Sequence, residues 1–455
     1  MGSPLRPMFS PASLKKLIYP LVIEQFLAVL VGIADTIMVS ALGEAAISGV
    51  SLVDMINVLI INIFAALATG GAVVASQYIG AGNERQARLS ASQLIFISLT
   101  ISLAIMGLCL AFNRNILMLL FGSAEDGVIG SAQVYFRISA YSYPFIAVYN
   151  ACAALFRAMG NSKVSMLTSV AANIFNVIGN AVLIYGAKMG VAGAATASAI
   201  ARFLCMAVML GLLFRRDNII YLSVKDGFRL NPMLIKRILR IAVPGSLESS
   251  VFQLGRVLVV SIIAGFGTVQ IAANAVANNL DGFGIVPGQA IGLAVVTVVG
   301  QCVGAEDKLQ VRYYTRKLIK ITYIILAVWN VFLIVTLPLT LKFYNLSGET
   351  LSLASTLIII HNGLAIFLWP LSFVLPNSLR AASDVKYPMA VSIFSMITFR
   401  ILFSYILGVN FGMGAIGVWI AMIIDWIFRI TMFIIRYRGE KWLSHKIDAG
   451  KRETA

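Results

Sequence analysis

Long apolar segments recur from one end of this chain to the other, and they limit its possible folds more than any other feature. Each exceeds about 18 residues, enough for a helix to cross roughly 30 Å of hydrocarbon. Of the 455 residues, 59% are hydrophobic and only 12% are charged. A soluble protein of this size needs more charge to cover its surface. Because backbone groups in lipid must be satisfied within the segment, the sequence predicts an all-α polytopic membrane protein.

Breaks between the apolar segments divide the chain into twelve predicted transmembrane helices. They are expected at residues 15–40, 47–80, 86–112, 128–158, 164–186, 191–214, 236–265, 270–304, 309–341, 350–381, 386–409 and 413–437. The first segment follows Arg6, Lys15 and Lys16, and it is longer than the core of a signal peptide. We therefore expect it to be a spanning helix that is not cleaved.

Basic residues alternate sharply between the two sets of connections. One set contains Arg6, Lys15, Lys16, Arg85, Arg88, Arg157, Lys163, the cluster from Arg215 to Arg240, Lys308, Arg312, Arg316, Lys317, Lys320, Arg380, Lys386 and the tail from Arg436 to Arg452. The other set contains Arg114, Lys188 and Lys342. The positive-inside rule then predicts that both termini are cytoplasmic, in a plasma or bacterial inner membrane. The net charge of +16 is explained by basic residues on the cytoplasmic side of the membrane, and no nucleic acid partner is expected.

The second half of the chain repeats the first at a nearly constant offset. Pro20 and Glu24 recur as Pro244 and Glu248. Three segment pairs continue the match: SQYIGAGNERQAR (76–88) with GQCVGAEDKLQVR (300–312), RAMGNSKVSM (157–166) with RAASDVKYPM (380–389), and GVAGAATA (190–197) with GAIGVWIA (414–421). Six helices per half is an even number, so both halves enter the membrane in the same orientation. They are predicted to be parallel repeats that rock around a central cavity in alternating access.

The repeat sets the expected domain organisation. An N-lobe is predicted at 1–214, a basic cytoplasmic linker at 215–238, a C-lobe at 239–437 and a basic cytoplasmic tail at 438–455. The chain shows no Ser/His/Asp constellation, no nucleotide-binding P-loop and no histidine-rich site. We expect no enzyme, no cofactor and no metal cluster, and we expect transport to be secondary rather than driven by ATP.

Charged residues inside apolar segments are the main candidates for function, since a carboxylate there costs about 2.5–3.5 kcal/mol on insertion scales. The embedded acids are Glu24, Asp35, Asp54, Glu248, Asp281 and Asp425, and the embedded bases are Arg137, Arg202, Arg256, Arg400 and Arg429. Asp35 is the first choice. A carboxyl group in a low-dielectric cleft can bind and release a proton near neutral pH. The alternative is an aspartate that caps the helix end or faces outer water.

Neutral residues in other positions could complete such a site. Asn176 and Asn180 are four residues apart, so they share a helix face. Their amides can bond Asp35 or offer oxygens to a hard cation, or they can serve only as polar contacts between helices. Pro20 removes one hydrogen bond from the first helix and makes it easier to bend, although proline near a helix start is also simply tolerated.

The other embedded charges fall into repeat-related sets. Glu24 and Glu248 occupy equivalent positions and are secondary candidates for coupling; the alternative is a structural role, in which they bond helix ends or pair with arginines. Asp54 and Asn57 of the first half correspond to Asn278 and Asp281 of the second, which leaves one carboxylate per lobe for a cation path or a salt bridge. Arg400 corresponds to Asn176, with Asp281 or Asp425 as its expected partner, and Arg429 is spaced for an in-helix pair with Asp425.

Four motifs, in order and together with the repeat, resemble the multidrug and toxic compound extrusion (MATE) family over essentially the whole chain. They are Pro20…Asp35-Thr36, the loop from Gln77 to Asn83, the turn from Arg157 to Lys163, and the run Asn176-Val-Ile-Gly-Asn180…Tyr185-Gly186. The resemblance implies a V-shaped pair of pseudo-twofold-related six-helix bundles. It also implies export of amphipathic, often cationic compounds in exchange for H⁺ or Na⁺. Lipid-linked oligosaccharide flippases have a similar architecture and remain the alternative; they should show a strongly cationic central cavity.

The resemblance also assigns roles to individual residues. It places the coupling carboxylate at Asp35, the rest of the N-lobe site at Asn176, Asn180 and Ser198, and a bend that responds to protonation at Pro20. Many relatives have aspartate where this chain has Asn180, and the missing negative charge weakens a sodium site. H⁺ is therefore the preferred coupling ion, with weak Na⁺ binding at Asp35, Asn176 and Asn180 as the other possibility. The expected partners are small amphipathic organic substrates and the bilayer, and the expected state is a monomer.

Overall fold

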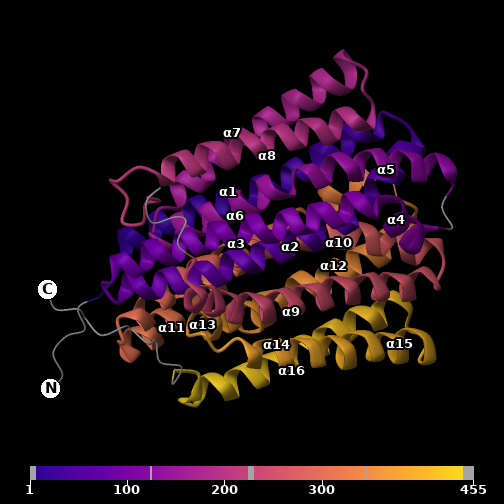
Figure 1. The fold of residues 1–455 in the computed structure, drawn as a ribbon. Coiled ribbons are helices and arrows are strands. Elements are labelled where there is room, and N and C mark those ends of the chain that lie inside the picture. Colours follow the sequence, from indigo (N-terminus) through magenta and orange to yellow (C-terminus); the bar gives the residue numbers. More distant parts are fainter. Residues whose placement is uncertain (1–6, 123–124, 224–229, 345, 444–455) are drawn as a thin grey trace, which may run out of the picture. The chain divides into compact units, whose positions relative to one another are not determined.

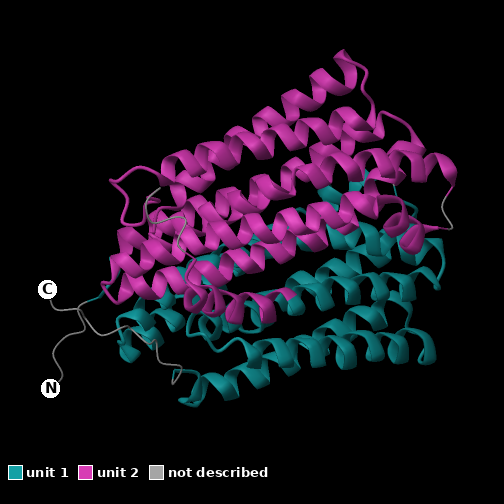
Figure 2. Ribbon diagram, viewed as in Figure 1, with its two compact units in different colours: residues 1–10, 247–455 teal, residues 11–246 magenta. Residues whose placement is uncertain are grey.

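The computed structural model describes residues 7–122, 125–223, 230–344 and 346–443, and within these it contains helices and no strand (Figure 1). The chain divides into two compact units (Figure 2). Unit 2 comprises Pro11–Ser246, and unit 1 comprises Met1–Ser10 with Leu247–Ala455. The all-α prediction is confirmed. Residues 224–229 of the expected basic linker and 444–455 of the expected basic tail lie outside the described residues.

Unit 2 carries the first set of helices. They are α1 (Pro11–Ser40), α2 (Glu44–Gly80), α3 (Glu84–Ala111), α4 (Asn113–Phe121), α5 (Asp126–Tyr141), α6 (Tyr143–Ala158), α7 (Ser162–Asn180), the π-helical η1 (Ala181–Gly186), α8 (Val191–Leu213) and the beginning of α9 (Pro232–Ala264).

Unit 1 carries the rest of α9 and the second set. These elements are α10 (Thr268–Gly304), α11 (Lys308–Leu341), the 3₁₀ turn η2 (Lys342–Tyr344), α12 (Gly348–Trp369), the π-helical η3 (Pro370–Val374), α13 (Leu375–Ala381), α14 (Lys386–Ser395), the π-helical η4 (Met396–Leu402), α15 (Phe403–Tyr405), the π-helical η5 (Ile406–Asn410), α16 (Gly414–Arg438) and the 3₁₀ turn η6 (Lys441–Leu443).

Within the described residues, eleven helices are long and apolar enough to span a membrane. The predicted helix at 128–158 provides the twelfth segment, but it is broken at Ser142 into α5 and α6. Pro144 at the start of α6 explains the break, because proline has no N–H to donate to the preceding turn. The other predicted spans match the observed helices to within a few residues. The short helix α4 was not expected from the sequence.

Local structure repeats between the halves. Asn83 caps the start of α3 by accepting from the backbone N–H of Gln86, and Asp307 caps α11 by accepting from Leu309 and Gln310. Gly43 and Gly267 precede α2 and α10 with φ of 102° and 96°, a conformation that only glycine adopts readily. The duplicated sequence therefore folds into duplicated turns.

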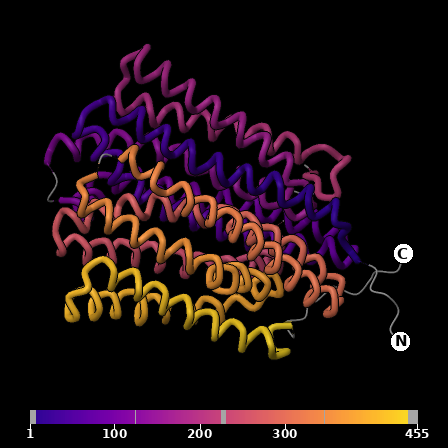
Figure 3. Tube along the Cα trace, turned by 180° about the vertical axis from the view of Figure 1, so that it is seen from behind, coloured from indigo at the N-terminus to yellow at the C-terminus, as the bar shows by residue number. Residues whose placement is uncertain are grey.

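Neighbouring helices also pack in the same way in each unit. In unit 2, α7 and η1 lie against α8, and in unit 1 the helices from α14 to η5 lie against α16 (Figure 3). In Figure 3, α7 with α8 and α14–η5 with α16 are each visible at an edge of the unit to which they belong. This packing brings the fifth and sixth spanning segments of each half side by side.

Two repeat-related ion pairs tie helices together within the units. Glu24 on α1 lies 3.8 Å from Nη1 of Arg157 on α6, and its Oε2 accepts from Ser165 at 2.9 Å. In unit 1, Arg380 on α13 donates to both carboxylate oxygens of Glu248 on α9, at 2.7 and 2.8 Å. Both glutamates are therefore paired with arginines, the structural alternative that the sequence left open.

Pro20 lies inside an uninterrupted α1. Because proline has no N–H, the carbonyl of Lys16 loses its usual helical donor. Ser162 at the start of α7 compensates: its hydroxyl donates to the carbonyl of Leu17 at 2.6 Å and lies 3.3 Å from that of Lys16. The helix at Pro20 thus depends on a side chain from another helix.

The geometry of the ion pairs predicts unequal effects of the two charge removals. Glu248→Gln should lower the free energy of unfolding by about 3 kcal/mol, because it leaves the guanidinium of Arg380 buried and unpaired. Glu24→Gln should cost clearly less, because its contact to Arg157 is longer and single. Unfolding in mixed micelles at increasing SDS, followed by tryptophan fluorescence, measures both. Equal losses in the two variants would contradict this account.

Candidate functional site

Four polar residues predicted from the sequence meet in unit 2. Nδ2 of Asn180 donates to Oδ1 of Asp35 at 2.7 Å and lies 3.4 Å from Oδ1 of Asn176. Nδ2 of Asn176 donates to Oγ of Ser198 at 2.9 Å. The contacts form one chain from α1 across α7 to α8. The structure therefore brings together all four residues of the expected N-lobe site.

Close packing of α7 and α8 makes this chain possible. Gly179 lies so near α8 that an added Cβ would come within 3.1 Å of the Cβ of Ala197. Gly193 lies against the backbone of Leu183, where an added Cβ would come within 2.9 Å of the carbonyl oxygen. Small residues allow two helices to approach closely in a membrane, which shortens the distance that Asn176 must bridge.

The helix changes character immediately after Asn180, where η1 begins. π-Helical turns are rare and often occur at functional sites. Asn176 and Asn180 are buried, with 6% and 1% of their surface exposed, whereas Asp35 is partly buried. Oδ1 of Asn180 is buried and has no hydrogen-bond partner among the described residues. The site thus contains one free acceptor beside one carboxylate.

A second polar group adjoins the cluster from α2. Nδ2 of Asn57 donates to Oδ1 of Asp54 at 3.3 Å, and the hydroxyl of Tyr143 donates to Oδ1 of Asn57 at 2.9 Å. Asp54 is exposed and interacts electrostatically with Asp35, as does Arg202. The secondary candidate Asp54 is therefore a charged neighbour of the cluster and not a member of its hydrogen-bond chain.

The break between α5 and α6 is part of this region. Nη1 of Arg202 on α8 donates to Oγ of Ser142, the single residue between the two helices, at 2.7 Å. Tyr143 follows directly. The apolar run 128–158 predicts one continuous helix, so neither the contact of Ser142 with Arg202 nor that of Tyr143 with Asn57 follows from the sequence. Pro144, in the middle of the apolar segment, was the sequence signal for this break. A proline there leaves backbone groups without helical partners, which side chains can then satisfy.

In unit 1, Asp281 has a partner that was not foreseen. Its Oδ2 lies 3.7 Å from Nε2 of His361, and Nδ1 of His361 lies 2.8 Å from Oδ1 of Asn362. The histidine ring packs edge-on against Trp419 and Trp426. Of the alternatives that the sequence left open for Asp281, a salt bridge to an arginine is not formed within 4.0 Å among the described residues, and His361 occupies that position. Sequence distance concealed the pair, because the two residues lie on different helices.

The expected pairs of Arg400 and Arg429 are also wrong. Among the residues that the structure describes, no carboxylate oxygen lies within 4.0 Å of either guanidinium. Oδ1 of Asp425 instead accepts a hydrogen bond from Ser395. Arg429 lies 4.5 Å from the centre of the Phe373 ring, a cation–π contact. The hydroxyl and the aromatic ring replace the ion pairs that helical spacing suggested.

Comparison with known proteins identifies the fold around these residues. The MatE family model matches residues 20–182 and again 244–406, once in each half of the repeat. The chain belongs to the MatE family. It is therefore a multi-pass membrane transporter, and the family resemblance predicted from the sequence is confirmed.

Relatives cover nearly the whole chain. It is 27% identical over 453 residues to YisQ, an uncharacterized transporter of Bacillus subtilis, with 96% of each protein covered. It is 24% identical to a probable multidrug resistance protein NorM of Thermotoga maritima, covering 94% of this chain and 92% of the relative. A solved MOP superfamily transporter from Pyrococcus furiosus superposes with a TM-score of 0.87 at 23% identity, covering 94% and 95%. This likeness shows the fold, and with it the predicted fold class is confirmed.

The geometry around Asn180 predicts how the site can be changed to bind sodium. Asn180→Asp places a second carboxylate beside Asp35, and two carboxylates with an amide oxygen suit a hard cation. Sodium at a hundred times its dissociation constant should then stabilise the variant by about 2.7 kcal/mol. Melting in NaCl against choline chloride measures the effect, with Asn180→Leu as the control. A variant whose Tm is the same in both salts would contradict the predicted ligand set.

Proposed function

We propose that this protein is a secondary active exporter that exchanges amphipathic, often cationic compounds for protons by alternating access. Asp35 is the proton-binding group, and Asn176, Asn180 and Ser198 hold it in place. The observation that carries the proposal is the 2.7 Å hydrogen bond from Asn180 to Asp35 inside a membrane-spanning bundle. The relatives described as multidrug resistance proteins support the substrate class.

The surroundings of Asp35 suit a group that changes its protonation state. Among the described residues, no basic nitrogen lies within 4.0 Å of its carboxylate, so it is not locked in an ion pair. Its hydrogen-bond partner is the neutral amide of Asn180, which donates to the carboxylate. After rotation by half a turn, the amide oxygen of Asn180 can accept from the protonated acid. Both protonation states therefore keep a hydrogen bond.

Sodium coupling is less well supported by the same residues. A sodium ion prefers several oxygen ligands with negative charge among them. Asp35 is the only carboxylate in the hydrogen-bond chain, and Nδ2 of Asn180 points at it. A proton needs only the one carboxyl group. H⁺ is therefore the coupling ion that we propose. We further propose that the protein acts as a monomer in the cytoplasmic membrane, with both termini in the cytoplasm.

A mechanical link between Asp35 and the rest of α1 is available at Pro20. The two residues share α1, and the carbonyls of Lys16 and Leu17 are held by Ser162 of α7. The same helix α7 carries Asn180, the partner of Asp35. A change at Asp35 that shifts α1 against α7 therefore acts on a helix that lacks one of its own hydrogen bonds. We propose that Pro20 is the hinge.

One observation favours the flippase alternative. Such a protein needs a cationic interior site for pyrophosphate, and a cavity in unit 1 is lined by Arg256 and Arg400. Asp281 interacts electrostatically with both arginines and Asp425 with Arg400, so the surroundings are not uniformly cationic. The exporter remains the better supported function, and ion-driven efflux separates the two.

The decisive experiment measures ethidium efflux from vesicles with imposed proton or sodium gradients. The wild type should respond to the proton gradient, and Asp35→Asn should reduce that response to background because the amide cannot bind a proton. Exchange of ethidium at equilibrium, without a gradient, should persist in the variant and serves as the control for folding. Full proton-driven efflux by Asp35→Asn would refute the proposed coupling group. Failure of both gradients in the wild type would refute ion-coupled efflux.

The hinge makes a separate prediction. Pro20→Ala restores the N–H that bonds Lys16, so it should raise stability by up to about 3 kcal/mol and slow proton-driven efflux. Ser162→Ala should lower the free energy of unfolding by about 1–3 kcal/mol in the wild type. The loss should be clearly smaller in the Pro20→Ala background, where the N–H of residue 20 bonds the carbonyl of Lys16. SDS unfolding of all four proteins tests this. An equal cost of Ser162→Ala in both backgrounds would show that the serine does not compensate for the proline.

A further inference from the structure

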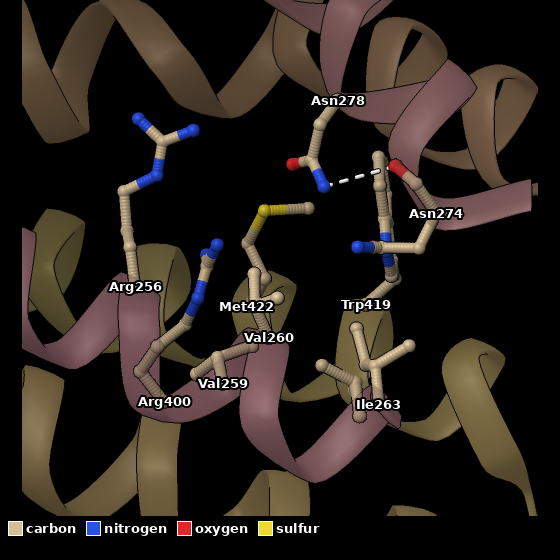
Figure 4. A pocket seen from close by; sticks show the side chains of 10 residues that line it. Arg256, Val259, Val260, Ile263, Asn274, Asn278, Arg400, Trp419 and Met422 are labelled. Carbon is tan, nitrogen blue, oxygen red and sulfur yellow. Dashed lines mark hydrogen bonds between the residues drawn. The ribbon is translucent and has the colours of Figure 1, made fainter. Parts of the chain in front are cut away.

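A cavity of about 220 Å³ lies within unit 1, between α9, α10 and α16 and the π-helical segment η4 (Figure 4). Its polar lining consists of Arg256, Arg400, Asn274, Asn278 and Trp419. The apolar lining consists of Val259, Val260, Ile263, Val418 and Met422. Figure 4 shows the two arginine side chains running in the same direction on one side of the cavity. The lining thus combines two cationic side chains with three other polar ones and five apolar ones.

The two guanidinium groups have no anionic partner. Among the described residues, no carboxylate oxygen lies within 4.0 Å of Arg256 or Arg400. Nε of Arg400 is buried and makes no hydrogen bond there. The two arginines also interact with each other, and two like charges held together repel. An arginine inside a membrane protein is normally paired. Arg256 is exposed and Arg400 is half-buried, so a ligand that enters the cavity can reach the donors of both guanidinium groups.

The nearby carboxylates contact other groups, although Oδ2 of Asp425 has no hydrogen-bond partner among the described residues. Oδ2 of Asp281 faces His361 at 3.7 Å, and Oδ1 of Asp425 accepts from Ser395. Both acids influence the arginines only at a longer range. They lower the local positive potential without occupying the donors of the guanidinium groups. Those donors are free to bind a group that enters the cavity.

The polar wall opposite the arginines is fixed by its own hydrogen bonds. Nε1 of Trp419 donates to Oδ1 of Asn274 at 3.0 Å, and Nδ2 of Asn278 donates to the backbone carbonyl of Asn274 at 2.9 Å. These bonds hold the indole and the amides in place. The aliphatic side chains of Val260 and Met422 complete the wall with a surface that suits an apolar body.

We propose that this cavity binds an organic anion, namely a carboxylate or phosphate joined to a compact apolar group. The anionic head lies between Arg256 and Arg400, whose planar donors match two-oxygen acceptors. The apolar body lies against the valines, Ile263 and Met422. A soluble organic acid and the head of an anionic phospholipid share this chemistry. The site goes beyond the proposed function, because it lies in the other unit from Asp35 and takes the opposite charge.

Binding of a matched pair of probes to the full chain tests the proposal. The purified protein in phosphatidylcholine nanodiscs is titrated with 2-naphthoate and with 2-naphthamide, which differ mainly in charge, and binding is measured by calorimetry. We expect naphthoate to bind at least about tenfold more tightly, a difference of 1.4 kcal/mol. No ion gradient is present, so the result does not depend on proton coupling at Asp35.

Variants then locate the site. Arg256→Gln and Arg400→Gln should each weaken naphthoate binding about tenfold or more, whereas Arg114→Gln, an exposed arginine of unit 2, should leave it unchanged. Val260→Trp fills the cavity without changing charge and should abolish binding. This variant keeps the test valid if an arginine variant does not fold. Equal binding of naphthamide, or naphthoate binding that survives both Arg256→Gln and Val260→Trp, would overturn the proposal.

A lipid arm separates the two sources of anion. Phosphatidylglycerol replaces part of the phosphatidylcholine in the nanodiscs. A phospholipid head is the occupant if phosphatidylglycerol weakens naphthoate binding to the wild type but does not weaken it further in Arg256→Gln. An unchanged affinity would identify a soluble anion. Either outcome supports an anion site at these arginines.

Discussion

A hydrocarbon environment offers no water to satisfy polar groups, and this constraint explains most of the structure. It forces the backbone into helices, and it requires each charged or polar side chain to find a partner inside its own bundle. Glu248 has Arg380, Asp281 has His361, and the carbonyl of Lys16 has Ser162 in place of the donor that Pro20 lacks. Groups left without a partner in such a setting are therefore informative. Oδ1 of Asn180 and Nε of Arg400 are two of them, and each lies in a candidate site.

Duplication produced two units with the same supports and different sites. The glutamate–arginine pairs, the glycines before the second helices and the capped third helices are retained in both halves. The positions that could act on a ligand have diverged. Asn176, which reaches Ser198, corresponds to Arg400, which faces a cavity. One unit thus presents a carboxylate with amides, and the other presents guanidinium groups, so the two halves have complementary electrostatic preferences.

The sequence predicted what depends on local patterns and missed what depends on contacts between distant segments. Hydropathy located the spans because burial in lipid acts on every residue of a helix, and the spacing of Asn176 and Asn180 placed both on one face. Hydropathy did not reveal the break between α5 and α6, because the apolar run continues through Pro144. The break arises from the backbone N–H that proline lacks. The pair of Asp281 with His361 and the unpaired Arg400 could not be foreseen. Spacing along one helix shows which residues share a face but not what the facing helix offers.

An amide partner has a consequence for how Asp35 could signal its protonation. A basic partner would be released when the acid is protonated, and the loss of that ion pair would itself move a helix. Asn180 can instead bond either form of the acid, so the contact survives and the change is one of charge and amide orientation. Rotation of the amide also alters what Asn180 presents to Asn176, and through it to Ser198 on α8. The hydrogen-bond chain therefore provides a route from α1 to α8, and the hinge proposed at Pro20 would let α1 respond at low cost.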